Sequence, residues 1–133
     1  MKVSISDYPK SKVSVQIDPH DTWNMDITLS YIILPMLKQL RDTSQGSSCT
    51  SDQDVPEELK STSAPPRDND YDIDDNHHLR WDWVLGEMIW SFDQKVTGFE
   101  PCYLSASSEH DKHQDRMSNG FLLFGKYYEG LWD

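Results

Sequence analysis

The chain has few cysteines, no long apolar segment and no apolar leader. Its two cysteines, Cys49 and Cys102, follow no pairing pattern, so free thiols are expected instead of a disulfide framework. The longest apolar run, YIILPML at residues 31–37, is far shorter than the roughly 20 residues of a membrane-spanning helix. Residues 1–10 lack the apolar core of a signal peptide. The sequence therefore predicts a soluble intracellular protein with no membrane partner.

Signatures of common enzyme classes are also lacking. There is no glycine-rich phosphate or dinucleotide loop, no G-x-S-x-G motif and no H-E-x-x-H motif. All-α nucleotide pyrophosphohydrolases hold Mg²⁺ with carboxylates spaced as E-x-x-E on facing helices. The nearest pairs here, Asp82 with Glu87 and Asp111 with Asp115, do not have that spacing. The sequence therefore gives no support to an enzymatic activity, which stays open as an alternative, and no cofactor is expected.

Basic residues are scarce, and the resulting negative charge is concentrated in one segment. Twelve Lys and Arg face 23 Asp and Glu, which gives a formal net charge of −11. Residues 45–78 hold −7 of this charge, with nine acids against Lys60 and Arg67. An acidic chain is repelled by phosphate backbones and anionic bilayers. Direct binding to nucleic acid is therefore disfavoured, and a basic partner surface is favoured.

Aromatic residues are plentiful enough to build one core. Five Trp, six Tyr and four Phe occur in 133 residues, a length that can bury roughly 70% of its unfolded surface. We predict a single, mainly α domain over residues 1–133, with a three-helix bundle-like core, a short amino-terminal β-ribbon and a long acidic loop. Its predicted parts are the ribbon at 1–18, a kinked helix at 22–42, the acidic loop at 43–76, and helices at 77–97 and 109–130.

The ribbon and the first helix are predicted from apolar periodicity. Residues 2–5 and 12–17 alternate as short strands do, and a two-stranded ribbon needs a surface beneath it, so we expect it to lie against the helices. Apolar residues at helical spacing in the first helix predict one buried stripe. Pro35 predicts a kink or a split there, because it removes one backbone hydrogen bond. The predicted stripe consists of Met25, Leu29, Ile32, Ile33, Met36, Leu37 and Leu40.

The second and third helices also carry apolar stripes. Asp74 or Asp75 is expected to cap the second helix. Gly120 and Gly125 interrupt the third helix, where each costs about 1 kcal/mol relative to alanine, so they are expected to permit close packing. The core positions expected across the three helices are Leu37, Trp81, Met88, Phe121 and Phe124.

The stretch DIDDNHHLRWDW, residues 72–83, is the densest group of potential metal ligands. His78 and Asp82 share a helical face, and the preceding acids could add oxygen ligands. A zinc site needs three or four convergent ligands, and no distant residue completes this set. Acids near a helix dipole and solvated histidines explain the pattern without a metal. The metal-binding alternative would use His77, His78, Asp82 and Glu87.

A second group of potential ligands lies nearer the carboxyl end. Cys102, His110, Asp111 and His113 could in principle gather a soft cation, but their spacing matches no familiar zinc finger. Surface positions on a loop and a polar helix start explain these residues without a ligand.

The acidic segment is the third candidate site. Carboxylates along a chain that could be extended resemble the charge density of a nucleic-acid strand, so they could occupy a basic groove in place of that polymer. An aromatic side chain would then serve as an apolar anchor. The alternative that the acids only aid solubility stays open. The predicted partner-binding residues are Asp68, Asp70, Tyr71, Asp72, Asp74, Asp75 and Trp90.

Four long blocks of the sequence are rich in apolar and aromatic residues. They are DTWNMDITLSYIILPMLKQL (21–40), DVPEELKST (54–62), DNHHLRWDWVLGEMIWSF (75–92) and RMSNGFLLFGKYYEGLWD (116–133). Together they resemble a family of uncharacterised proteins encoded by tailed bacteriophages, and the resemblance covers most of the chain after Val13. Family members tend to carry His in place of Ile27 and an acid in place of Gly86. A site that uses those two positions is therefore not expected here.

The resemblance implies no established activity, but it does suggest a class of function. Small acidic phage proteins without enzymatic motifs often inhibit host machinery, including restriction and CRISPR nucleases. We therefore predict a protein of the host cytoplasm that inhibits a host nucleic-acid-handling complex, an anti-CRISPR-like role. Its partner would be a host protein or ribonucleoprotein with a basic groove. Two alternatives stay open: a metal-dependent nucleotide hydrolase of an all-α type, and a phage assembly or virion-associated protein.

Overall fold

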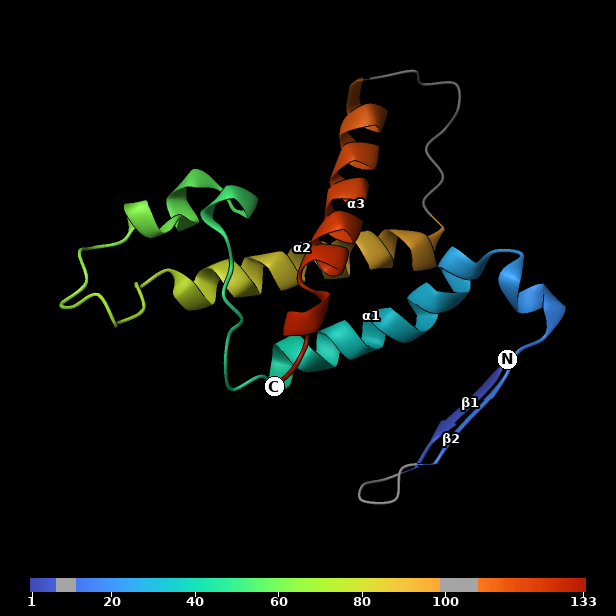
Figure 1. The fold of residues 1–133 in the computed structure, drawn as a ribbon. Helices are drawn as coiled ribbons and strands as arrows, with labels where there is room; N and C mark the ends of the chain where they lie inside the picture. Colours follow the sequence, from blue (N-terminus) through green and yellow to red (C-terminus); the bar gives the residue numbers. More distant parts are fainter. Residues whose placement is uncertain (7–11, 99–107) are drawn as a thin grey trace.

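Three helices form the body of the protein in a computed structural model that describes residues 1–6, 12–98 and 108–133. They are α1 (Met25–Thr43), α2 (His77–Thr97) and α3 (Ser108–Lys126). Both α1 and α3 pack against α2. Figure 1 shows α1 running beside α2, while α3 crosses α2 steeply. The prediction of a mainly helical protein with three helices and a short ribbon is confirmed.

The ribbon is an antiparallel hairpin of β1 (Lys2–Ile5) and β2 (Val13–Gln16). Because side chains alternate along a strand, its register gathers the apolar residues on one face. The pairs that define this face are Val3 with Val15 and Ile5 with Val13.

The expectation that the ribbon lies against the helices is wrong. Every residue of both strands is exposed, and the hairpin projects away from the helices (Figure 1). The 3-10 helix η1 (Pro19–Thr22) stands between the ribbon and α1 and separates them. The apolar face of the ribbon is therefore uncovered.

Helix α1 buries only part of the predicted stripe: Leu37 is in the core and Ile33 and Leu40 pack against it, but Leu29 is exposed. Leu34 and Leu37 pack into the core, whereas Met25 and Met36 are 53% and 66% exposed. Apolar residues occupy two neighbouring faces of this helix, and only the face with Leu34 and Leu37 meets α2. Pro35 lies within α1 without splitting it, since the helix is continuous from Met25 to Thr43.

Helix α2 is the centre of the core. Its predicted inner stripe is buried at Trp81, Val84, Leu85 and Met88, and also at Phe92. The predicted caps Asp74 and Asp75 are wrong, because the residue at the N-cap position is Asn76. Gly98 ends the helix with a φ of 66°, a left-handed conformation that glycine adopts without strain.

Helix α3 crosses α2 at Gly120. A Cβ at Gly120 would overlap the Ser91 hydroxyl and lie 2.7 Å from the Glu87 carbonyl oxygen, so the predicted close packing is confirmed there. It is wrong for Gly125, which has open space around it. Phe121 and Phe124 are partly buried against the core. The helix ends at Lys126, short of the predicted 130, and the 3-10 helix η5 (Tyr128–Gly130) follows.

Candidate functional site

The acidic loop is ordered by three short 3-10 helices and by one buried guanidinium. The 3-10 helices are η2 (Asp52–Asp54), η3 (Glu57–Leu59) and η4 (Ser61–Ser63). Arg80, on the first turn of α2, is only 5% exposed and lies beneath them. Its Nη1 donates to the Leu59 carbonyl oxygen at 3.2 Å, which ties the loop to the helix.

Asp74 neutralises this buried guanidinium. Nη1 and Nη2 of Arg80 each donate to a carboxylate oxygen of Asp74 at 2.7 Å, and the Asp74 side chain is only 11% exposed. The hydrogen bonds from Arg80 lower the pKa of Asp74 from its ordinary 3.8 to about 2. Bidentate contacts between arginine and a carboxylate are among the strongest ion pairs in proteins. Asp74 is therefore held by the protein itself.

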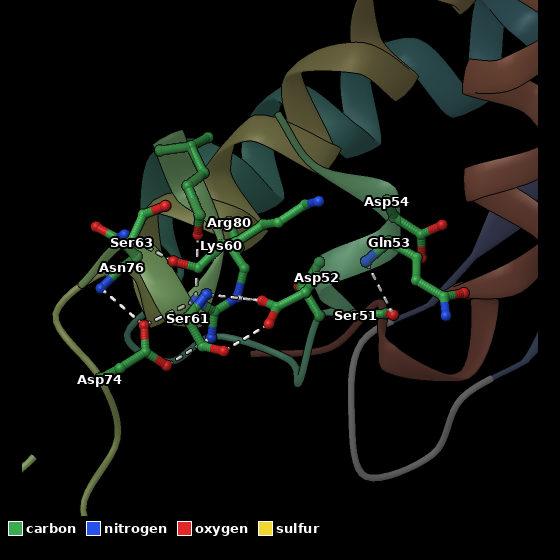
Figure 2. Close-up of polar contacts among 12 residues, drawn as sticks. Ser51, Asp52, Gln53, Asp54, Lys60, Ser61, Ser63, Asp74, Asn76 and Arg80 are labelled. Atoms are coloured by element: carbon green, nitrogen blue, oxygen red, sulfur yellow. Dashed lines mark hydrogen bonds and ion pairs between the residues drawn. The ribbon is translucent and has the colours of Figure 1, made fainter. Parts of the chain in front are cut away.

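Asp52 and Asn76 complete the anchor that Figure 2 shows around Arg80. The Ser61 amide and hydroxyl donate to the two oxygens of Asp52 at 2.8 and 2.5 Å, and this lowers the pKa of Asp52. The side-chain amide of Asn76 donates to the Lys60 carbonyl oxygen at 3.1 Å. These contacts join η2, η4 and the start of α2 into one unit.

Asp54 fixes the same loop to the end of α3. Tyr127 donates its hydroxyl hydrogen to Asp54 at 2.5 Å, and the Ser51 amide donates to the Tyr127 oxygen at 3.0 Å. Lys126 pairs with the same carboxylate. Burial, followed by the bond to Asp54, raises the pKa of Tyr127. We call residues 44–66 the anchored segment, because two of its four acids, Asp52 and Asp54, are engaged with other parts of the protein.

The acidic tip, defined as residues 67–73 with Asp75, is organised differently. The Asn69 side chain accepts hydrogen bonds from the amides of Tyr71 and Asp72 at 2.8 and 3.0 Å, which closes a tight turn. The tip is therefore turned back on itself, whereas an extended strand was considered from the sequence. Tyr71 is 98% exposed and Ile73 is 56% exposed.

Carboxylates flank these exposed apolar side chains in the sequence. Within the described residues, Asp68, Asp70 and Asp75 form no ion pair, and the Asp72 carboxylate accepts a hydrogen bond only from the Asn69 side chain, at 2.8 Å. All four acids are exposed. The tip projects beyond the start of α2 (Figure 1). It therefore offers uncompensated negative charge next to an aromatic ring.

Trp90 is not part of this surface. It lies thirteen residues along α2 from His77, a helical distance of about 20 Å. The Arg116 guanidinium covers its ring at 3.9 Å, and the His113 ring meets it edge-on at 5.0 Å. Trp90 thus takes part in the packing of α2 against α3.

The residues of the metal-binding alternative contact different elements. His78 bonds to the Ser47 hydroxyl at 2.8 Å, Asp82 accepts from Arg41 at 2.8 and 2.9 Å, and Glu87 accepts from Arg116 at 2.9 Å. The His77 ring meets the His78 ring edge-on. Among the described residues, no three His, Cys, Asp or Glu side chains are grouped so that they could hold an ion.

Three of the four residues in the second group of potential ligands lie within the described residues. Cys102 lies outside the described residues. His110 lies 3.8 Å from Asp111, and His113 bonds to the Gln94 side chain at 3.0 Å.

Two residues that shape this site were missed by reasoning from the sequence. Arg80 precedes Val84 and Met88 at steps of four, so the inner stripe itself placed Arg80 on the buried face. Ile73 follows Tyr71 by two residues and adds apolar surface to the tip. A charged residue on an apolar stripe, with acids shortly before it, was the signal for the anchor.

Comparison of the chain with family models, curated proteins and solved structures finds no match. Within residues 1–6, 12–98 and 108–133, no helix has both the length and the apolar character needed to cross a membrane. The contacts described above therefore carry the functional argument.

Proposed function

We propose that the protein works by binding, and that its acidic tip docks into a basic groove of a host nucleic-acid-handling protein or ribonucleoprotein. One observation carries the proposal: Asp68, Asp70 and Asp75 are exposed, lack ion-pair partners in the described chain and lie within four residues of the exposed Tyr71 in the sequence. The docked tip would occupy the place of nucleic acid and inhibit the complex. The phage-like sequence blocks support the choice of a host target.

Electrostatics give the tip a long-range role. Uncompensated carboxylates on a projecting loop raise the rate of encounter with a basic surface, and salt weakens this attraction. Acids that already have a partner in the protein contribute much less. In this proposal Asp74 fixes the tip to the helix by pairing with Arg80. The partner is contacted by Asp68, Asp70, Asp72 and Asp75.

Tyr71 supplies the short-range part of the interaction. Aromatic residues near the centre of an interface often account for most of its binding energy, because they bury a large surface with little loss of flexibility. Tyr71 is fully exposed before binding, and Ile73 widens the apolar area beside it. Asn69 holds the backbone at Tyr71, and Arg80 holds Asp74, the residue after Ile73, so less ordering of the backbone is required on binding.

The test is affinity capture from nuclease-treated bacterial lysate, with quantitative mass spectrometry of the retained proteins. The first bait is the native chain, and the second carries Asn at Asp68, Asp70, Asp72 and Asp75. The matched control makes the same charge change on α3 and η5, at the exposed residues Glu109, Asp111, Asp115 and Glu129.

The native chain and the control should retain the same nucleic-acid-binding proteins, and less of them as salt rises. The tip variant should lose them, and a Tyr71→Ser variant should retain less than the native chain. Equal retention by the tip variant and the control, or capture that is insensitive to salt, would refute the proposal.

A further inference from the structure

The β-ribbon presents an apolar face that nothing in the described chain covers. Val3 and Ile5 of β1 share this face with Val13 and Val15 of β2, and all four are exposed. A two-stranded ribbon is marginal in water unless it packs against another surface. An apolar surface outside its own chain would therefore stabilise the ribbon.

A second, partly uncovered apolar surface lies at the edge of the core, where α1 meets the end of α3. An open groove of about 810 Å³ runs between α1, the end of α3 and the residues after η5. Met36 and Tyr128, which line it, are 66% and 64% exposed. The main apolar residues of this α1–α3 groove are Ile33, Met36, Leu40, Phe124, Tyr128 and Leu131.

We propose that the ribbon of one copy of the protein lies in the α1–α3 groove of a second copy, and that the exchange is reciprocal. The lengths agree, because a four-residue strand spans about 13 Å and the helix from Ile33 to Leu40 rises about 10 Å. In a two-fold dimer each ribbon would enter the groove of its neighbour.

The charges of the two surfaces are complementary. Residues 1–17 carry three lysines and one aspartate, a net charge of +2. Since the whole chain has a net charge of −11, the remaining residues carry −13. Asp133 lines the groove, which has no basic side chain among its described lining residues. The ribbon is thus the basic part of an otherwise acidic molecule, and the groove contributes one acid.

Reciprocal exchange also brings the contact closer to the size of a stable dimer interface. Stable interfaces bury about 1,200–2,000 Å² in total, more than one small ribbon face provides. Two ribbons and two grooves double the covered area. Within a single chain the ribbon projects away from the helices, and its residues stay exposed (Figure 1).

The test measures oligomeric state by sedimentation equilibrium and light scattering at high micromolar concentration. The full chain should be a dimer. Val15→Asp on the ribbon and Met36→Asp in the groove should each raise the dimer dissociation constant about a hundredfold, because each places a charge in an apolar contact. Both positions are exposed, and circular dichroism should show unchanged helix content.

Two matched controls use the same substitution on the opposite faces. Ser14→Asp alters the polar face of the ribbon, and Tyr31→Asp alters a side of α1 that does not line the groove. Both variants should dimerise like the native chain. A monomeric native chain would overturn the proposal.

A mixture of the two interface variants distinguishes exchange from other pairings. The Met36→Asp protein keeps an intact ribbon, and the Val15→Asp protein keeps an intact groove, so together they form one native contact. The mixture should therefore associate more tightly than either variant alone. If Met36→Asp has no effect while Val15→Asp dissociates the dimer, ribbons pair with ribbons and the proposal fails.

Discussion

The anchored segment and the acidic tip belong to one loop, yet they use carboxylates in opposite ways. In the anchored segment Asp52 bonds to Ser61 and Asp54 bonds to Tyr127, so both acids hold structure together. In the tip Asp70 and its neighbours face solvent. Formal charge along a sequence therefore does not measure the charge that a partner meets, because part of it is already compensated.

Asp74 marks the boundary between the two parts. It lies next to the tip in the sequence, but its carboxylate is buried against Arg80. Stability should thus depend on the anchored segment together with Asp74 and Arg80. Binding should depend on the acidic tip. Each of the following predictions tests that division, beginning with the largest effect.

Replacing Arg80 with methionine should have the largest effect. The substitution leaves the Asp74 carboxylate buried without its partner, and breaking such a pair costs about 3 kcal/mol. Urea unfolding followed by circular dichroism would measure the loss. Arg67→Met is the control, because Arg67 is exposed and bonds only to the Asp72 carbonyl oxygen. Equal midpoints for the two variants would contradict a structural role for Arg80.

Acid should weaken the anchor before the pH reaches 2. The pKa of Asp74 is lowered from 3.8 to about 2 in the folded protein, so its stabilising contribution is complete above pH 3.8. As the pH falls from 3.8 towards 2 this contribution is lost, on the order of 2 kcal/mol. Unfolding free energies at pH 5, 4, 3 and 2 would show it.

The Asp74→Asn variant isolates the contribution of that one carboxylate. Its stability should fall less steeply between pH 4 and 2 than that of the native chain. Asp70→Asn is the control, because it removes a carboxylate without removing an ion pair. Identical slopes for native and Asp74→Asn proteins would show that the pair does not stabilise the fold.

Replacing Tyr127 with phenylalanine should have a smaller effect on the same segment. The change removes the hydroxyl that bonds to Asp54 and to the Ser51 amide, at a cost of about 1–2 kcal/mol. Asp54 keeps Lys126 as a partner, which limits the loss. The matched control is Tyr128→Phe at an exposed neighbour. Thermal unfolding would compare them, and a smaller loss at Tyr127 than at Tyr128 would contradict the prediction.

Apolar periodicity was enough to predict the helices but not which face of α1 packs. The predicted stripe is continuous from Met25 to Leu40, yet Met25 and Met36 are exposed, whereas Leu37 joins the core together with Leu34, which lies outside the stripe. A helix with two apolar faces satisfies the same pattern in either orientation, and only the position of the neighbouring helix decides. Close packing was predicted for Gly120 and Gly125 alike, and only the position of α2 separates Gly120, which meets Ser91, from Gly125, which has open space around it.

The candidate site could be predicted as a set of residues but not as a geometry. The sequence placed acids from Asp68 to Asp75 together, but it could not separate Asp74 from the rest, because that depends on Arg80 facing inward. Nor could it predict the turn at Asn69, which exposes Tyr71. Both features arise from contacts between side chains that local spacing does not specify.

The smallest effect on stability is expected for the tip itself, and there the two parts of the loop should differ most clearly. Changing Asp68, Asp70, Asp72 and Asp75 to Asn together should alter the unfolding free energy by no more than about 0.5 kcal/mol, because exposed acids without partners stabilise little. Urea unfolding measures this change. The same variant should lose partner capture, whereas Tyr127→Phe should lose stability and retain capture. A tip variant that unfolds as easily as Arg80→Met would mean that the acids of the tip also hold the fold together.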